Sequence, residues 1–432
     1  ERRAHDGKRI LAIFYSVFLI IPSALAAAIF ALHPDRFLGG YAIRDFTMPQ
    51  RLLSEGRALV DYIGALLLPR GPAMGVFNDD FAVSTGLLSP PSTVFALLAL
   101  VAISVLAIAL RKRAPSVFAG WFFFLVAHAI ESSVLPLELY FEHRNYLPAF
   151  GLLLAVAGIA EFLTRRIEPG AMPRWKLGVL AAGVYALALG LATHARAFVW
   201  ADEGRFLLQA AVHHPDSLRA NTALAYYEIH QGNATAARAA IDGLLQSPNP
   251  HVREMAYLVR VEADCIISGN ATPNDLHQAI ALARPFVTLD EQYVFADLAS
   301  INDQRTCNGA DPALLADTIV EILAAAHSQS DGIPPKWKLR LTAAQLYAAA
   351  GDWKRALPQA KLAWQPGADA PVGAFLVRTY VHNGMRDKAE RTYVEVAKRI
   401  DPYNTNDRLG LVNLRNYLDQ SAVDSNQATD SH

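Results

Sequence analysis

The segment that decides the fold is ESSVLPLELYFEHRNYLP, residues 131–148. It separates two apolar runs, residues 117–130 and 147–163, which are rich in Leu, Phe, Val and Ala. Apolar runs of this kind are typical of helices that lie in a membrane. We call residues 131–146 the polar segment, and we expect it at a membrane surface.

The polar segment gathers ionisable side chains, namely Glu131, Glu138, Glu142, His143 and Arg144. Each of them is costly to remove from water at a membrane boundary unless it has a partner. Such a cluster is by default a functional-site hypothesis. The alternative is that Glu142 and Arg144 only cap and snorkel at helix ends, with His143 as a neighbour that has no role.

The composition of the chain restricts its class of function. With 432 residues, the chain is long enough for two or three domains. A formal net charge of -1 excludes a basic surface for nucleic acid, so no nucleic-acid partner is expected. The apolar runs lie before Ala197, and the remainder reads as water-soluble. Because residue 1 is Glu rather than Met, we expect the chain to be cut from a longer one.

The first half of the chain contains five segments that are long and apolar enough to cross a membrane. They are residues 10–32, 93–110, 117–134, 147–163 and 177–193. The first is too long for the apolar part of a signal peptide and is interrupted by Pro22, so we interpret it as a span. The sequence predicts an all-α protein, with a bundle of about five spans in residues 1–197.

The loops between these spans carry Lys and Arg unevenly, which sets the orientation of a membrane protein. Basic clusters precede the first span and follow the second and the fourth: Arg2, Arg3, Lys8, Arg9, Arg111, Lys112, Arg113, Arg165, Arg166, Arg174 and Lys176. All of them fall on one side, which the charge rule assigns to the cytoplasm. The loop 33–91, the polar segment and everything after the fifth span then face the extracytoplasmic side. We expect a multi-pass protein of the cytoplasmic membrane, in contact with the bilayer, with its C-terminal part in the periplasm.

The loop 33–91 contains an amphipathic pattern at residues 48–68. Its apolar stripe is Leu52, Leu53, Leu59, Val60, Ile63 and Leu67, and the opposing polar residues are Gln50, Arg51, Glu55 and Arg57. The pattern predicts a helix that lies along the outer membrane surface or dips into it. A break in the chain follows at residues 69–72, which read PRGP.

Two neighbouring carboxylates, Asp79 and Asp80, follow this break within Phe77-Asn78-Asp79-Asp80-Phe81. Paired Asp side chains can bind a divalent ion or share a proton. The same Asn-Asp-Asp run is ordinary turn chemistry, and we favour that interpretation. His128, inside the third expected span, is interpreted as a residue that is hydrogen-bonded within the bundle.

The second half of the chain shows an internal repeat. When Gly232, Gly351 and Gly384 are aligned as turn residues, an Ala follows each glycine five residues later: Ala237, Ala356 and Ala389. The interval between residues 351 and 384 is close to the 34-residue period of tetratricopeptide repeats. We therefore expect an α-solenoid of such repeats at residues 198–418. Stacked helical hairpins form a concave surface that suits peptides, although they also serve as scaffolds without a peptide ligand.

Three further features of this half are less regular. Residues 254–329 are helical in pattern, with Gly269 as a turn, and could hold one or two degenerate repeats. The only cysteines are Cys265 and Cys307. An extracytoplasmic compartment permits their pairing, but the sequence does not show whether their Cα atoms are close enough. The tail 419–432 is rich in Ser, Asp and Gln, and we expect it to be disordered.

Taken together, these features resemble the transmembrane and tetratricopeptide-repeat (TMTC-type) protein glycosyltransferases of the GT-C superfamily, whose bacterial relatives include pilin-modifying enzymes. The motifs that carry the resemblance are Arg44-Asp45-Phe46, Arg51-Leu52-Leu53, Leu67-Leu68-Pro69-Arg70, Phe77-Asn78-Asp79-Asp80-Phe81, Leu87-Leu88-Ser89-Pro90 and Glu142-His143-Arg144-Asn145-Tyr146-Leu147-Pro148. The resemblance covers residues 10–403, and the last motif is its most specific part.

The resemblance implies an enzyme that transfers a sugar from a polyprenyl-phosphate donor to a protein hydroxyl on the extracytoplasmic side, with the repeats binding the acceptor. The catalytic carboxylate of the family lies in the first extracytoplasmic loop, between the first two spans of a larger bundle. That part has no counterpart in this sequence. We expect the C-terminal portion of such an enzyme, because the chain begins without Met, rather than a chain that has lost catalysis.

Transfer from a lipid phosphate needs a cation near the phosphate and a base for the acceptor. Arg144 is the expected phosphate ligand, because a guanidinium makes bidentate contacts to phosphate oxygens. Glu142 is expected to hold Arg144 or to position the acceptor, and His143 to contact the phosphate or move a proton. The base is expected in the absent part, with Asp79 or Asp80 as weaker candidates. Arg44 as a second phosphate ligand and the supporting residues complete the set: Arg44, Asp45, Glu131, Glu138, Asn145 and Tyr146.

No cofactor or metal site is assigned, although a divalent ion would be compatible with this chemistry. The alternative function is a non-enzymatic membrane adaptor, whose repeats recruit a protein partner while the spans serve as an anchor. The charged polar segment argues against the adaptor, because an anchor has no need of charges at the membrane surface.

Overall fold

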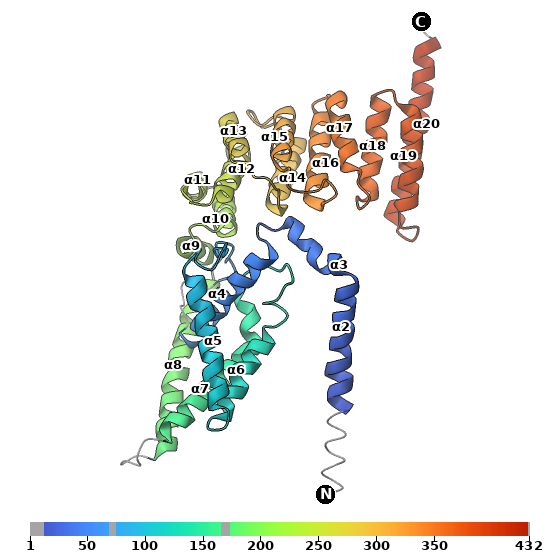
Figure 1. Cartoon of the computed structure of the whole chain (residues 1–432). Helices are drawn as coiled ribbons and strands as arrows, with labels where there is room; N and C mark the ends of the chain where they lie inside the picture. The colour runs from blue at the N-terminus through green and yellow to red at the C-terminus, as the bar shows by residue number, and fades with distance from the viewer. Residues whose placement is uncertain (1–12, 69–74, 166–172, 431–432) are drawn as a thin grey trace. The chain divides into compact units, whose positions relative to one another are not determined.

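The computed structural model of the chain is all-α (Figure 1). It describes residues 13–68, 75–165 and 173–430, and within those ranges it holds 19 α-helices. The chain divides into two compact units, Glu1–Arg196 and Ala197–His432, which we call the membrane unit and the repeat unit. The basic residues 2, 3, 8, 9 and 166 and the expected break at 69–72 lie outside the described residues.

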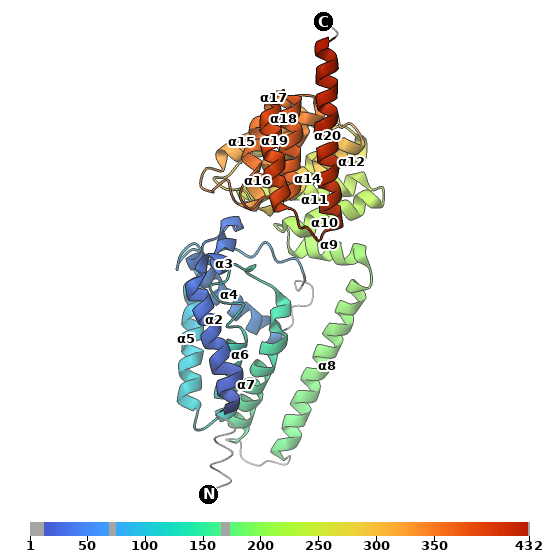
Figure 2. The same ribbon diagram turned by 90° about the vertical axis from the view of Figure 1, so that its right-hand side faces the viewer.

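The membrane unit contains long apolar helices and a middle helix of mixed character (Figure 2). Its elements are a π-helical turn at Ser16–Ile20, α2 (Ile21–Leu32), α3 (Pro34–Leu38), a 3-10 turn at Gly39–Ile43, α4 (Met48–Leu67), α5 (Ser92–Leu110), α6 (Pro115–Ala127), a 3-10 turn at Glu142–Asn145, α7 (Tyr146–Thr164) and α8 (Arg174–Trp200).

Four helical segments are long and apolar enough to cross a membrane: Ile13–Leu32, Ser92–Leu110, Glu142–Thr164 and Gly178–Trp200. They correspond to the first, second, fourth and fifth expected spans, and their outward side chains are large and apolar, as at Phe95 and Phe150. A lipid environment suits such surfaces, because they would be an aggregation hazard in water. The chain is therefore a membrane protein with about four candidate spans.

The third expected span, 117–134, is wrong in its length. Helix α6 has 13 residues and ends at Ala127, so it rises by about 20 Å, less than the hydrocarbon core of a bilayer. Turns follow at residues 128–135, where Glu131, Ser132 and Ser133 interrupt the apolar run and Arg51 donates hydrogen bonds to the carbonyl groups of Glu131 and Ser133.

Helices α6 and α7 form a close hairpin because three glycines lie at their contact. A Cβ on Gly120 would come within 2.4 Å of the Gly151 carbonyl oxygen, and one on Gly158 within 2.7 Å of the Ser116 hydroxyl. Membrane helices pack through such small residues, since lipid supplies no hydrophobic force between them. The hairpin fixes the two ends of the polar segment, which joins the two helices.

The repeat unit is a series of helical pairs (Figure 1). Its helices are α9 (Glu203–His213), α10 (Leu218–His230), α11 (Ala234–Leu244), α12 (Pro250–Ser268), α13 (Pro273–Ala281), α14 (Leu289–Gln304), α15 (Pro312–Ala325), α16 (Pro334–Ala349), α17 (Trp353–Ala363), α18 (Ala370–His382), α19 (Arg386–Arg399) and α20 (Thr405–Asp430).

The repeat register read from the sequence is confirmed. Gly232, Gly351 and Gly384 lie between paired helices with φ of 75, 80 and 70°, a conformation that favours glycine. The alanines five residues after them, Ala237, Ala356 and Ala389, are all fully buried. The turn glycine sets the angle of each hairpin, and the small Ala lets the two helices approach.

The irregular region 254–329 forms two further helical pairs, α12 with α13 and α14 with α15. Gly269 ends α12 with φ of 68°, as expected of a turn glycine. A disulfide joins Cys265 near the end of α12 to Cys307 in the loop after α14, which answers the question that the sequence left open. The buried core of this region includes Leu258, Phe295 and Ile319.

The C-terminal tail differs from expectation. Helix α20 runs from Thr405 to Asp430 and so includes most of the residues expected to be disordered. Leu414 and Leu418 on this helix are buried at 1% and 0% exposure against the last repeat. Once such packing has formed the first turns, each further residue adds one hydrogen bond at small cost, so a polar sequence can continue the helix.

Candidate functional site: a buried charge cluster beside the polar segment

The N-terminal half of α4 buries polar side chains. Arg51 and Ser54 are fully buried and the Glu55 side chain is 3% exposed, whereas Leu52 on the apolar stripe is 42% exposed. The expected amphipathic helix is therefore present, with its capping box of Thr47 and Gln50. Its polar residues pack against the protein rather than facing water, because the polar segment lies along that face and supplies partners.

Arg51 organises the backbone of the polar segment. Its guanidinium donates to the carbonyl oxygens of Ser133 (3.1 Å), Glu138 (3.1 Å), Glu131 (2.5 Å) and Leu137. It also pairs with Glu55 one turn further along α4, at 2.8 Å. A segment without regular structure must satisfy its buried carbonyl groups individually. One guanidinium performs that task here, so the position of the polar segment depends on Arg51.

Arg144, the expected phosphate ligand, lies beside this pair. Its Nε is 3.2 Å from an oxygen of Glu131, and its Nη1 is 4.0 Å from an oxygen of Glu55. The Arg144 side chain is only 5% exposed, whereas that of Glu131 is 41% exposed. The most mobile partner of Arg144 is therefore Glu131, which can turn toward water and leave the guanidinium available.

Several buried polar atoms around Arg144 have no partner in hydrogen-bond geometry: both carboxylate oxygens of Glu55, Nη1 of Arg144, Oε2 of Glu131, Oγ of Ser132, Oδ1 of Asn145 and Nε2 of His128. Native proteins leave few such atoms unsatisfied, and groups of them mark strain, catalysis or a bound molecule. These atoms come from α4, from the end of α6 and from the polar segment. They form the charge cluster that we treat as the candidate site.

Burial raises the pKa of Glu55 to about 7, an effect that the charge of Arg51 partly opposes. Helix α4 lies outside the candidate spans, and this carboxyl can therefore exchange a proton near neutral pH. His128 is also buried, with Nδ1 3.1 Å from the Phe124 carbonyl oxygen and its ring stacked on Tyr62. That contact agrees with the expectation of a histidine hydrogen-bonded within the bundle.

The two expected catalytic residues of the polar segment, Glu142 and His143, differ from each other in their contacts and exposure. Glu142 is 3.4 Å from Arg196 of α8 and accepts a hydrogen bond from the backbone N–H of Gly75. The Glu142–Arg196 pair joins the polar segment to the last span. His143 is exposed against Phe141, and Tyr146 is 87% exposed.

The remaining expected residues differ in their burial. Arg44 pairs with Glu138 at 2.7 Å and donates to the Pro136 carbonyl oxygen, so the loop before α4 contacts the polar segment. Asp45 is exposed, and Asn145 is buried with its amide donating to the Glu142 carbonyl oxygen.

The Asp79–Asp80 pair occurs in a turn closed by a hydrogen bond from Phe81 N–H to the Asn78 carbonyl oxygen. This geometry agrees with the interpretation as turn chemistry that the sequence favoured. Among the described residues, the one group of His, Cys, Asp or Glu that could hold a metal ion is elsewhere, in the repeat unit.

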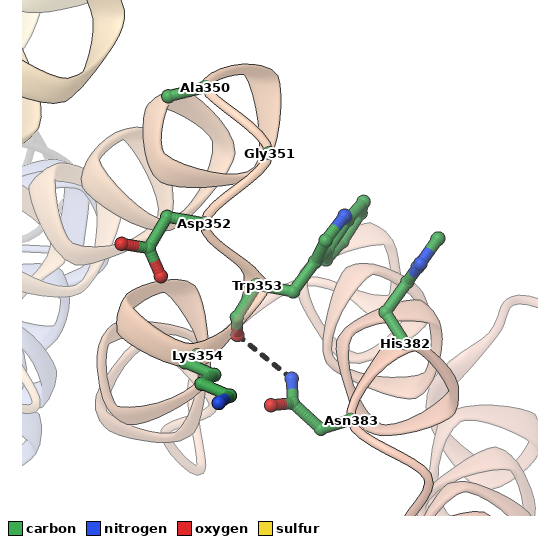
Figure 3. A pocket seen from close by; sticks show the side chains of 7 residues that line it. All are labelled: Ala350, Gly351, Asp352, Trp353, Lys354, His382 and Asn383. Atoms are coloured by element: carbon green, nitrogen blue, oxygen red, sulfur yellow. Dashed lines mark hydrogen bonds between the residues drawn. The ribbon is translucent and has the colours of Figure 1, made fainter.

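The repeat unit offers a shallow pocket at its turns rather than on a helical face. It is lined by Ala350–Lys354, His382 and Asn383 and has a volume of about 590 Å³ (Figure 3). The rings of Trp353 and His382 stack there with centroids 3.6 Å apart, and the Asn383 amide donates to the Trp353 carbonyl oxygen. This stacked pair joins two neighbouring repeats and exposes ring faces that suit a peptide side chain.

Sequence reasoning missed Arg51 and Glu55 as members of the site, since it placed them on the polar face of a surface helix. A signal was nevertheless present. An Arg and a Glu spaced four apart on an amphipathic helix form a pair, and a second group of charges follows in the polar segment, so the two groups could have been matched.

Comparison with known proteins adds no assignment: no protein-family model matches the chain, and no curated protein matches its sequence.

Proposed function

We propose that this chain is part of a membrane glycosyltransferase that takes a sugar from a polyprenyl-phosphate donor and attaches it to a protein hydroxyl on the extracytoplasmic side. The observation that carries the proposal is the charge cluster. The Arg144 side chain is 5% exposed in the first turn of a candidate membrane span, it lies beside Glu55, and its partner Glu131 is partly exposed. A phosphate oxygen could replace the Glu131 carboxylate on that guanidinium.

The other residues of the cluster have roles that follow from their contacts. Arg51 holds the polar segment in position and does not contact the donor, because its donors are engaged by carbonyl groups and Glu55. Glu55, with a pKa of about 7, is the group best placed to accept a proton during transfer. Arg196 and Glu142 keep α8 beside the site.

The orientation is part of the proposal. The disulfide Cys265–Cys307 supports an oxidising compartment for the repeat unit, since such bonds are rare in the cytosol. The basic turn Arg111–Arg113 after α5 supports a cytoplasmic position for the other end of the bundle. A phosphatase reporter fused after Ala201 is expected to be active outside the cytoplasm, and one fused at Lys112 is expected to be inactive there. The reverse pattern would overturn the orientation and the proposed enzyme with it.

The proposal is tested by sugar transfer. The complete protein of which this chain is a part is purified in nanodiscs and mixed with radiolabelled polyprenyl-phosphate sugars and peptides that contain Ser and Thr, and labelled peptide is counted. We expect Arg144→Lys to lower the product at least about tenfold, because Lys lacks the planar fork that matches phosphate oxygens. Arg165→Lys, in an exposed pair with Glu161, is the matched control and should leave the product unchanged.

A second function, the non-enzymatic adaptor, is favoured by the extent to which Arg51 and Arg144 are already neutralised by carboxylates. In that case the cluster serves only to hold the helices together. Product no greater than that of empty nanodiscs would refute the transferase and leave the adaptor, and equal product from wild type and Arg144→Lys would remove Arg144 from the site.

A further inference from the structure

The repeat unit contains a buried group of ionisable side chains that the proposed function does not use. His251 and Glu254 lie on α12 and Glu291 lies on α14, and each of them is buried. Nδ1 of His251 and one oxygen of each carboxylate lie within 4.8 Å of one another. We infer that these three side chains form a site for a divalent transition-metal ion such as Zn²⁺.

The distances favour an ion over direct hydrogen bonds. Nδ1 of His251 is 3.9 Å from Glu254 and 3.8 Å from Glu291, which is too long for a hydrogen bond between charged groups. Two ligands that each lie about 2.0 to 2.2 Å from a shared Zn²⁺ are at most about 4.4 Å apart. The separations observed for the imidazole and each carboxylate therefore suit two ligands of one ion.

The unsatisfied atoms face the same space. Nδ1 of His251 and both carboxylate oxygens of Glu254 are buried without a hydrogen-bond partner, and the Glu254 side chain is 1% exposed. A buried carboxylate in this situation is costly unless a cation compensates it. Arg284 is the nearest guanidinium, at 3.6 Å from Glu254 and 3.0 Å from Glu291. The two carboxylates of the group thus face Arg284 and, when it is protonated, His251; an ion bound at Nδ1 would take the place of that proton.

Surrounding residues orient the ligand atoms. Asp290 lies 3.2 Å from Nε2 of His251 and can accept a hydrogen bond from that nitrogen, so in the metal-bound form Nδ1, which faces the two glutamates, would be the ligand atom. The N–H and hydroxyl of Thr288 donate to Oε2 of Glu291 at 2.9 and 2.6 Å. Oε1 of Glu291 accepts from Arg284 and keeps a second lone pair for the ion.

The ligand set indicates the class of ion. One imidazole and two carboxylates suit Zn²⁺ or Mn²⁺, whereas Ca²⁺ and Mg²⁺ prefer oxygen ligands alone. The partly exposed side chains of His251 and Asp290, at 11% and 40%, give an ion access from solvent. Because the ligands come from the first turns of α12 and α14, the ion would join two neighbouring helical pairs at the end opposite to the Cys265–Cys307 disulfide.

The test measures metal on the tag-free full chain in detergent. After treatment with EDTA, the protein is incubated with Zn²⁺, desalted, and analysed for bound zinc by mass spectrometry. Wild type should retain one more zinc per chain than Glu254→Gln. Asp290→Asn, which loses only the orienting contact, should weaken binding by about ten- to a hundredfold. The matched control is Glu262→Gln, a buried carboxylate on the same helix outside the group, which should bind like wild type.

Equal zinc content in wild type and Glu254→Gln, with both chains folded by circular dichroism, would overturn the site and leave a network held by a protonated imidazole. If Glu254→Gln does not fold, the site is tested on the wild type alone, by the effect of Zn²⁺ on its melting temperature. Zn²⁺ at a hundred times its Kd should then raise the melting temperature of the EDTA-treated chain by roughly 5 to 10 °C. No change on adding Zn²⁺ would also overturn the site.

Discussion

Both units bury charged side chains, but they do so by different means. In the repeat unit, His251, Glu254 and Glu291 lie on helices, and their polar atoms contact other side chains and, at Glu291, the Thr288 N–H. In the membrane unit, Arg51 satisfies several carbonyl groups of an irregular segment. The comparison predicts that loss of one of these side chains in the repeat unit leaves the helical backbone in place, whereas loss of Arg51 releases the polar segment.

The largest expected effect is that of Arg51→Leu. The change leaves Glu55 buried without its closest cation and leaves carbonyl groups of the polar segment without a donor, so it should cost about 3 to 5 kcal/mol. Hydrogen–deuterium exchange of the full chain in detergent should show faster exchange in residues 131–146 and in α4. Unchanged exchange there would contradict the structural role of Arg51. The control is Lys112→Leu, in the basic turn that follows α5, which should leave this exchange unchanged.

Loss of the disulfide should affect the repeat unit alone. Cys265→Ser opens a loop of 42 sequence positions, and we expect a loss of about 2 to 4 kcal/mol in the free energy of unfolding. Denaturant titration of the oxidised wild type and the variant measures this difference. Exchange in the membrane unit should stay the same, and a change there would show that the two units are coupled.

Glycines have different roles in the two units, close helix packing in the membrane unit and turn geometry in the repeat unit. Gly120→Ala should destabilise the α6–α7 hairpin by about 1 to 3 kcal/mol, because its Cβ would meet the backbone of Gly151. Gly384→Ala in the repeat unit meets nothing and is disfavoured only by its φ of 70°, at about 1 kcal/mol. Gly183→Ala in α8, which has open space and ordinary backbone geometry, is the control for both. Thermal unfolding of the three variants measures their losses of stability. Equal losses for Gly120→Ala and Gly384→Ala would contradict the expected difference between a steric clash and a backbone penalty.

A smaller effect is expected from pH. The pKa of Glu55 is raised from 4.5 to about 7 on folding, so between these values the unfolded chain has lost a proton that the folded chain keeps. Stability therefore falls as pH rises from about 4.5 to 7, with a slope of at most about 1.4 kcal/mol per pH unit from this group. Exchange of α4 amides, corrected for intrinsic rates, should report the fall, and Glu55→Gln should remove it. An unchanged slope in Glu55→Gln would contradict the raised pKa.

The sequence predicted the repeat unit more closely than the membrane unit, for a physical reason. In a helical hairpin, local rules fix the turn glycine and the packing alanine, and both recur at positions such as Gly351 and Ala356. The early end of α6 at Ala127 has a local cause in part, because Glu131, Ser132 and Ser133 follow soon after it and Pro136 comes next. The path of the chain beyond it depends also on Arg51, some 80 positions earlier, whose guanidinium binds the Glu131 carbonyl group.

The candidate site was predicted in part for the same reason. The charges of the polar segment were visible, because they interrupt apolar runs, and Arg144 does lie in the buried cluster. Glu55 was not assigned to the site, because an amphipathic pattern shows that a helix has two faces but not which face the protein covers. Here Arg51 and Glu55 are buried against the polar segment, whereas the apolar stripe ranges from the exposed Leu52 to Leu59 and Ile63, which pack against the core that includes Trp121 and Phe124.

The account rests on Arg144 as a ligand of a lipid phosphate, and its affinity for that lipid is the most direct measurement. Polyprenyl phosphate without sugar is titrated against the purified full chain in nanodiscs, with Arg144→Lys, Glu131→Gln and the control Arg165→Lys. We predict saturable binding by wild type and the control, weaker binding by at least about tenfold for Arg144→Lys, and tighter binding for Glu131→Gln, because the carboxylate that competes with phosphate is gone. No binding by wild type, or equal affinity in all four proteins, would contradict the account.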